Sequence, residues 1–271
     1  MISRRLLLGA ALCPALARAD EATPTVLRPE LSRLFADAGV QGTFVALRLA
    51  PRELTVADES RARAPMIPAS TYKIPNSLIA LETGVVGDVD QETFRWDRVT
   101  RDIAEWNRDH TLRTAIKYSV VPVYQEIARR IGAARMQSYV DAFDYGNRDI
   151  GGGIDRFWLD GNLRISAFGQ VMFLEKLYRD QLSLSKRSMM LVRDILPVVE
   201  AGGARLRAKT GASVKDGKLA LGWLVGWAGE GERATIFALN LDLRGAADLA
   251  QRAPLAAEML GRIGALQGRD R

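Results

Sequence analysis

The chain has 271 residues, of which 48% are hydrophobic, with 38 Lys and Arg against 32 Asp and Glu. A chain of this length buries about three quarters of its unfolded surface, as one large domain or two closely joined lobes. Its charges are scattered without a basic run, which argues against a nucleic-acid partner. One histidine, His110, and one cysteine, Cys13, exclude a zinc site built from several such ligands. His110 lies in a polar run that predicts a solvent-facing turn and not a catalytic base.

Residues 1–19 have the composition of an export signal. Arg4 and Arg5 supply the basic start, residues 6–16 a short apolar stretch, and residues 17–19 a small-residue cleavage site. The stretch is too short for a permanent membrane span, and the paired arginines lean toward twin-arginine export. We therefore expect a periplasmic protein with no membrane attachment after cleavage, the alternative being a cytosolic protein with an amphipathic start. The remaining chain has no cysteine, so its stability must come from its core.

The first part of the chain predicts a short helix and a hairpin. Residues 28–38 have helical character. Residues 42–49 alternate and are rich in strand formers, and residues 54–57 read as their hairpin partner across the turn at 51–53.

From residue 70 to about residue 193, apolar side chains recur at helical spacing. Glycines punctuate residues 146–161, which predicts a functional loop or a series of turns. Strands return at residues 219–228 and 233–241, and a final helix follows at about 246–263.

Strands at both ends with helices between them predict an α+β fold. We expect an antiparallel sheet from residues 20–66 and 205–271, flanked by helices, and an inserted all-helical lobe from about 67 to 204. A cleft between sheet and lobe is the natural place for a site. Ser70 begins the lobe and Lys209 begins the returning sheet, so both should border that cleft.

The sequence S-T-Y-K at residues 70–73 places a hydroxyl and an amine three positions apart, on one face of a helix. A serine is a weak nucleophile until a base takes its proton, and Lys73 can do so only if it is neutral or modified. Taken alone, S-x-x-K is also explained by a helix-start serine beside a solvated lysine. The K-T-G sequence at 209–211 completes a pair of motifs typical of penicillin-recognising serine enzymes.

Five motifs in order resemble the class D serine β-lactamases, the oxacillinase family, over essentially the whole chain after the signal. They are the nucleophile segment at 68–77, with Tyr72 where Phe is more usual, the segment Y-S-V-V-P-V-Y-Q at 118–125, Y-G-N at 145–147, F-W-L at 157–159, and K-T-G at 209–211 followed by L-D-L-R-G at 241–245. Class A enzymes fit less well, because they carry S-D-N where this chain has Ser119 and two valines. The resemblance implies the fold of the serine β-lactamases and penicillin-binding transpeptidases.

The resemblance also implies the chemistry. Ser70 would attack the β-lactam carbonyl and form an acyl-enzyme, while Lys73 would react with carbon dioxide to become a carbamate, an N6-carboxylysine. The carbamate would act as general base for acylation and deacylation. Trp158 would donate its indole N–H to the carbamate and shield it, the alternative being a packing tryptophan. Carbon dioxide or bicarbonate is thus required, with no organic cofactor and no metal.

By the same resemblance, Ser119 would pass a proton to the departing ring nitrogen, helped electrostatically by Lys209. Without the motif, Ser119 would read as a helix cap.

The substrate-binding residues implied by the family are Thr210, Gly211, Ala212 and Arg244. Thr210 and Arg244 would bind the substrate carboxylate, because a hydroxyl and a guanidinium suit a planar anion. The backbone N–H groups of Ser70 and Ala212 would form the oxyanion hole. Ala212 is smaller than the side chains associated with that position, which would widen the cleft.

The sequence therefore predicts a secreted class D β-lactamase that hydrolyses penicillins, with some cephalosporins in range. Two alternatives share its motifs: a penicillin sensor domain, which would need preceding membrane-spanning helices, and a D-alanyl-D-alanine peptidase, which would deacylate slowly. Monomer and homodimer both fit the sequence.

Overall fold

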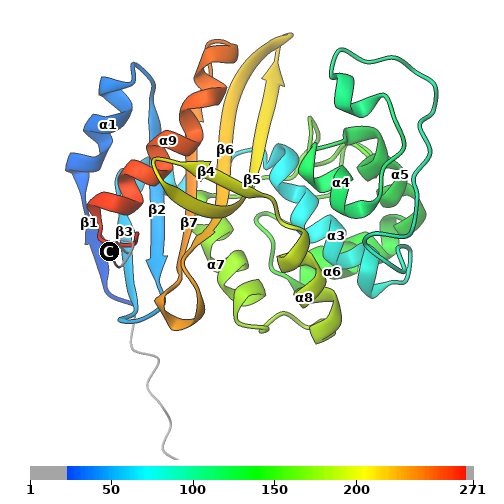
Figure 1. Cartoon of the computed structure of the whole chain (residues 1–271), viewed down its shortest axis with the longest axis horizontal. Coiled ribbons are helices and arrows are strands. Elements are labelled where there is room, and N and C mark those ends of the chain that lie inside the picture. Colours follow the sequence, from blue (N-terminus) through cyan, green and yellow to red (C-terminus); the bar gives the residue numbers. More distant parts are fainter. Residues whose placement is uncertain (1–22, 267–271) are drawn as a thin grey trace, which may run out of the picture.

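The computed structural model describes residues 23–266, so the predicted signal at 1–19 lies outside the described residues. Within this range seven strands form one sheet in the order β1-β3-β2-β7-β6-β5-β4 (Figure 1). Their bounds are β1 Thr25–Leu27, β2 Gly42–Arg48, β3 Glu53–Val56, β4 Val198–Ala201, β5 Ala204–Lys215, β6 Lys218–Ala228 and β7 Thr235–Asp242. Neighbouring strands are antiparallel except for β1, which lies parallel to β3.

Helices cover both faces of the sheet and form a separate lobe beside it (Figure 1). Their bounds are α1 Ser32–Asp37, α2 Glu59–Arg63, α3 Lys73–Glu82, α4 Leu112–Lys117, α5 Val121–Ile131, α6 Ala133–Ala142, α7 Ala167–Tyr178, α8 Lys186–Ile195 and α9 Ala246–Arg262. Single 3-10 turns occur at Pro29–Leu31, Ala69–Tyr72, Ala104–Trp106 and Gly231–Arg233. The α+β class predicted from the sequence is confirmed.

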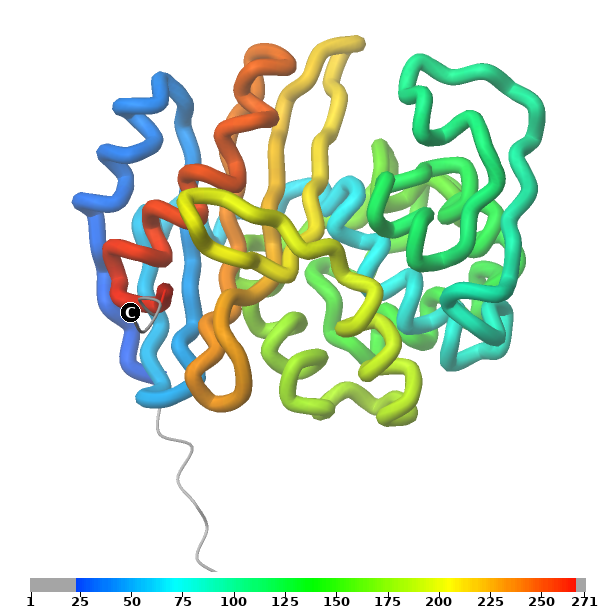
Figure 2. The backbone as a smooth tube through the Cα atoms, viewed as in Figure 1, coloured from blue at the N-terminus to red at the C-terminus, as the bar shows by residue number. Residues whose placement is uncertain are grey.

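Both faces of the sheet are buried. Successive side chains of β2 point to opposite faces and enter two different cores. Val45 and Leu47 join the core that includes α7 and the lobe, whereas Phe44 and Ala46 join the core under α1 and α9. Figure 2 shows that the first strands and the last helix lie together at one end of the molecule. Both ends of the chain thus build the sheet, as predicted.

The α3 helix is the centre of the lobe. Every residue from Lys73 to Leu81 is buried, and the helix packs against α5 and α8. A helix that is buried all round needs neighbours on every side. Lys73 is therefore held at the start of a fully enclosed helix.

Three differences from the sequence expectation concern the strands. The edge strand β1 was not expected, because its three residues are all exposed and show no buried face. The sheet resumes at β4, from Val198, and not at about residue 205, because β4 is a short and mostly exposed strand with a weak apolar pattern. Alternating Arg and Lys side chains similarly disguise the long strand β5.

The hairpin of β2 with β3, the turns at 146–161, the later strands β6 and β7, and the final helix are confirmed. Among residues 23–266, no helix combines the length and the apolar character needed to cross a bilayer.

Candidate active site

Ser70 lies in a strained turn that leads directly into α3. Ala69, just before it, has a φ of +48°, a left-handed conformation that is rare for residues other than glycine. Thr71 holds the turn, because its hydroxyl donates to the Pro68 carbonyl at 2.7 Å and accepts from Gln170 Nε2 at 2.8 Å. Strain that is held by buried hydrogen bonds is typical of functional sites.

The predicted pair of Ser70 and Lys73 is in contact. Lys73 Nζ lies 2.7 Å from Ser70 Oγ, and the Lys73 side chain is fully buried. Burial, and secondly the nearby Lys209, hold the pKa of Lys73 well below its ordinary value. The amine also lies 5.3 Å from the centre of the Tyr124 ring. A neutral amine beside the hydroxyl is able to accept its proton.

Ser119 and Lys209 form a second pair, which joins the α4–α5 connection to β5. Lys209 Nζ donates to Ser119 Oγ at 3.0 Å and to the Thr210 carbonyl at 2.9 Å. Burial, with a contribution from Arg252, lowers the pKa of Lys209 to about 7. Ser119 itself has a left-handed φ of +56° in the short connection between α4 and α5.

Gly211 allows β5 to approach the nucleophile turn. A Cβ at this position would lie 3.1 Å from both the Pro68 carbonyl oxygen and Thr71 Cγ2. The neighbouring strand is tied to the same segment, because Trp223 Nε1 donates to the Ile67 carbonyl at 2.9 Å. The glycine of K-T-G is therefore explained by a close backbone approach.

The strand direction also places the Ala212 N–H. The N–H of Ala208 donates to the Pro197 carbonyl, on the β4 side of β5. Because N–H groups two residues apart point the same way along a strand, the Ala212 N–H points to the same edge. There, β5 has passed the end of its pairing with β4, which stops at Arg207. An oxyanion-hole donor at Ala212 fits this edge.

Trp158 is fully buried, and its Nε1 has no hydrogen-bond partner among the described residues. A buried donor left unpaired costs about 1–3 kcal/mol, so an acceptor is expected beside it. The indole stacks on Tyr72, the residue before Lys73, with ring centroids 5.6 Å apart. The open donor thus belongs to a ring that packs on the residue next to Lys73 in the chain.

Arg244, the predicted carboxylate ligand, is not brought to the other site residues. Its side chain is 68% exposed, and it faces Asp248 with an N–O distance of 3.5 Å. Its Nη2 lies 3.6 Å from where a Cβ would stand at Gly39. The residue follows the end of β7, where the Leu243 N–H donates to the Ala220 carbonyl on β6.

Arg252, on α9, contacts β5 and was not singled out from the sequence. Its Nη1 donates to the Gly211 carbonyl at 2.8 Å. Its stem crosses Gly222, where a Cβ would lie 3.2 Å from Arg252 Cδ. Burial lowers the pKa of the guanidinium to about 10, so it is still charged at neutral pH. The sequence analysis missed Arg252 because packing of α9 over a glycine, and not a local motif, sets its position.

Comparison with known proteins identifies the family. Residues 44–261 match the penicillin binding protein transpeptidase domain. The chain is 51% identical over 200 residues to β-lactamase OXA-48 of Klebsiella pneumoniae, covering 74% of this chain and 75% of that relative. It is 40% identical over 236 residues to β-lactamase OXA-5 of Pseudomonas aeruginosa, covering 86% and 88% respectively. The crystal structure of FUS-1 (OXA-85), a class D β-lactamase from Fusobacterium nucleatum subsp. polymorphum, matches with a TM-score of 0.83 at 34% identity, covering 89% of this chain and 100% of that one.

The chain belongs to the class D β-lactamases. The resemblance and the enzyme class predicted from the sequence motifs are thereby confirmed.

In this class D β-lactamase, His110 is buried and not solvent-facing. Only 2% of the residue is exposed, and its ring nitrogens lie 3.1 Å from Thr114 Oγ1 and 2.8 Å from the Glu105 carbonyl oxygen. Burial lowers its pKa. The polar residues around it in sequence gave no sign of the isolated backbone bridge that pairs His110 with Phe94. Its contacts join chain segments, so a structural role explains it.

Proposed function

We propose that this class D β-lactamase hydrolyses the amide of β-lactams, penicillins above all, through an acyl-enzyme on Ser70, with a carboxylated Lys73 as general base. The observation that carries the proposal is the 2.7 Å contact of Ser70 Oγ with the buried Lys73 amine. Acyl transfer needs a nucleophile, a base and a proton donor for the leaving group, and the Ser70–Lys73 and Ser119–Lys209 pairs offer groups for these roles.

Carboxylation of Lys73 fits the chemistry of its pocket. Carbon dioxide reacts with a neutral amine, and burial together with the nearby Lys209 lowers the pKa of Lys73, which favours the neutral form. The unpaired Trp158 N–H supports the proposal, because a carboxyl group in this region would give it an acceptor. When present, the group supplies an anionic base that takes a proton without a histidine or a glutamate.

Acylation uses the pairs already described. Ser70 Oγ forms a bond to the β-lactam carbonyl carbon and passes its proton to Lys73. The N–H groups of Ser70 and Ala212 hold the oxyanion. The ring amide bond then breaks, and Ser119 gives its proton to the departing nitrogen while Lys209 restores it through their 3.0 Å contact. The proton that Lys73 took then returns to Lys209. In deacylation, water adds to the ester carbonyl carbon and gives a proton to Lys73, and the bond to Ser70 Oγ breaks as Oγ takes that proton back.

The substrate carboxylate binds beside β5. Thr210 Oγ1 lies 3.3 Å from Lys209 Nζ, and the Arg252 guanidinium contacts the next carbonyl along the strand. A hydroxyl beside a cation suits a carboxylate. Arg252 is held by the Gly211 carbonyl, which points away from the edge that carries the Ala212 N–H. Arg244 therefore stays the proposed guanidinium ligand, because its side chain is 68% exposed and can turn toward a bound substrate.

We also propose export to the periplasm by a signal in residues 1–19, supported by the basic, apolar and small-residue order of that segment. Amino-terminal sequencing of protein from the periplasmic fraction tests this. A start near Asp20 supports export, and an uncleaved cytosolic chain contradicts it.

Mass spectrometry of the purified protein with benzylpenicillin, followed over time, tests the hydrolase assignment. We expect an adduct on Ser70 that forms and then clears, and no adduct on Ser70→Ala. This variant should still fold, because one partly buried hydroxyl at a helix start contributes only about 1 kcal/mol. A persistent adduct on the wild type would indicate a sensor or a slow peptidase instead.

A further inference from the structure

A stack of aromatic rings connects the nucleophile turn to Trp158. The Tyr72 ring lies against the Trp158 indole at 5.6 Å, with only 23° between their planes. Phe157 meets both rings edge-on, at 4.9 Å in each case. Tyr72 and Trp158 are fully buried, so neither ring can move without displacing its neighbours.

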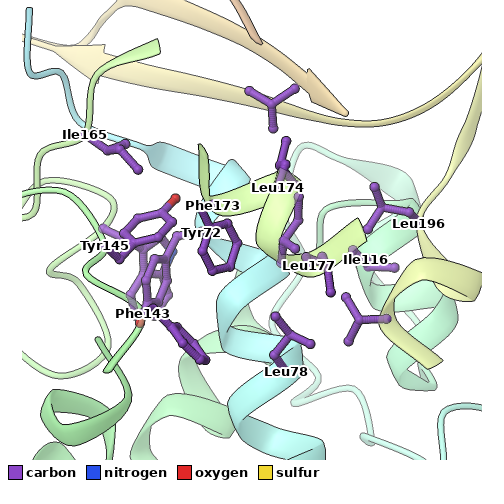
Figure 3. Close-up of a cluster of buried hydrophobic side chains, with 14 of the residues drawn as sticks. Tyr72, Leu78, Ile116, Phe143, Tyr145, Ile165, Phe173, Leu174, Leu177 and Leu196 are labelled. Atoms are coloured by element: carbon purple, nitrogen blue, oxygen red, sulfur yellow. The ribbon is translucent and has the colours of Figure 1, made fainter. Parts of the chain in front are cut away.

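The Tyr72 ring is itself held from behind. Tyr145 meets it edge-on at 5.5 Å, and Figure 3 shows these two labelled rings packed together within the buried cluster. The Tyr72 hydroxyl donates to Met136 Sδ at 3.1 Å, but a thioether is a weak acceptor. Packing of the ring therefore fixes its position more than the hydroxyl does.

Packing, and no hydrogen bond within residues 23–266, orients the Trp158 indole. Its Nε1 has no hydrogen-bond partner in the described part of the chain, so no polar contact fixes the direction of the N–H. The face of the indole rests on Tyr72, which directly precedes Lys73 at the start of α3. The direction of this donor relative to Lys73 thus depends on the stack.

We propose that the Tyr72 ring is the positioning element for Trp158 and so sets the affinity of Lys73 for carbon dioxide. This inference rests on the carboxylation of Lys73 in the proposed function. Tyr72 touches neither substrate nor reacting atoms, so it acts through Trp158. Because the flat ring holds Trp158 in position, a phenylalanine at residue 72 would hold it equally well, whereas an aliphatic side chain would not.

The test compares Tyr72→Leu and Tyr72→Met, which both remove the flat ring, with Tyr72→Phe, which keeps it. Phe173→Leu is the matched control, since Phe173 is a buried ring of the same cluster that packs edge-on against Tyr145 at 5.0 Å. For each protein the bicarbonate concentration giving half-maximal activity is measured, together with the carbon-13 carbamate signal. Circular dichroism shows which variants fold, and activity is measured at a temperature at which all the compared proteins are folded. If only one of Tyr72→Leu and Tyr72→Met folds, that variant alone decides the test.

We expect the ring-free variants to need about tenfold more bicarbonate, the size of effect expected from losing an aromatic pair. Tyr72→Phe and Phe173→Leu should stay within about twofold of the wild type. Ring-free variants that match the wild type would overturn the inference, and so would a Phe173→Leu shift as large as theirs. A wild type with neither carbamate signal nor bicarbonate response would overturn the carboxylation itself, which distinguishes the two failures.

Discussion

Lys209 Nζ donates a hydrogen bond to Ser119 Oγ across 3.0 Å, although the two residues are 90 positions apart in the chain. The contact joins strand β5 of the sheet to the connection between α4 and α5 in the helical lobe. It places a buried cation, whose pKa is about 7, beside the hydroxyl that serves the leaving nitrogen.

This pKa predicts how stability depends on pH. The folded protein releases the Lys209 proton near pH 7, whereas the unfolded chain keeps it to about 10.5. Between these values the unfolded state binds more protons, so the free energy of unfolding gains up to about 1.4 kcal/mol per pH unit from this group as pH rises. Urea unfolding at pH 7, 8 and 9 should give a shallower rise for Lys209→Met than for the wild type. Equal rises would contradict the assignment.

Substitution of Arg244 tests its role at the substrate carboxylate. We expect Arg244→Ala to raise KM by about tenfold or more, because it removes binding of that carboxylate. Arg205→Ala is the matched control, since Arg205 is 75% exposed and lies on the part of β5 that pairs with β4. It should leave KM within about twofold of the wild type. Steady-state kinetics with benzylpenicillin decide the matter, and an unchanged KM in Arg244→Ala would remove Arg244 from this role.

Gly211→Ala tests the close approach of β5 to the nucleophile turn. The added methyl group would lie 3.1 Å from the Pro68 carbonyl oxygen, which is backbone and yields little. Displacement of β5 by a fraction of an ångström should lower kcat/KM by about tenfold or more, since misplacement by 1 Å can cost about a hundredfold. Gly87→Ala is the control, because a Cβ there meets nothing within 4 Å. Activity of Gly211→Ala equal to that of the control would show that the approach is unimportant.

Contacts between residues that are close in the chain could be predicted from the sequence, whereas contacts between distant residues could not. The contact of Ser70 with Lys73 is predictable, because three residues at a helix start fix it. The contact of Ser119 with Lys209 was expected only through the family resemblance, since no local pattern joins positions so distant. Arg252 was missed because its reach to β5 depends on how α9 packs on the sheet.

The same distinction holds for the fold. Strands with a buried face, such as β2, β6 and β7, show their alternation or apolar character in the sequence. The edge strands β1 and β4 are mostly exposed, so pairing with a neighbour and not their own pattern makes them strands.

The most direct test of the central claim is carbon-13 NMR of the enzyme with labelled bicarbonate, combined with activity in degassed acidic buffer. The account predicts a carbamate resonance that is absent in Lys73→Ala, loss of activity when carbon dioxide is removed, and recovery when bicarbonate is added. Trp158→Ala should weaken the resonance and let the acyl-enzyme accumulate. Full activity without carbon dioxide, together with no carbamate resonance, would contradict the claim and leave Lys73 as an unmodified amine base.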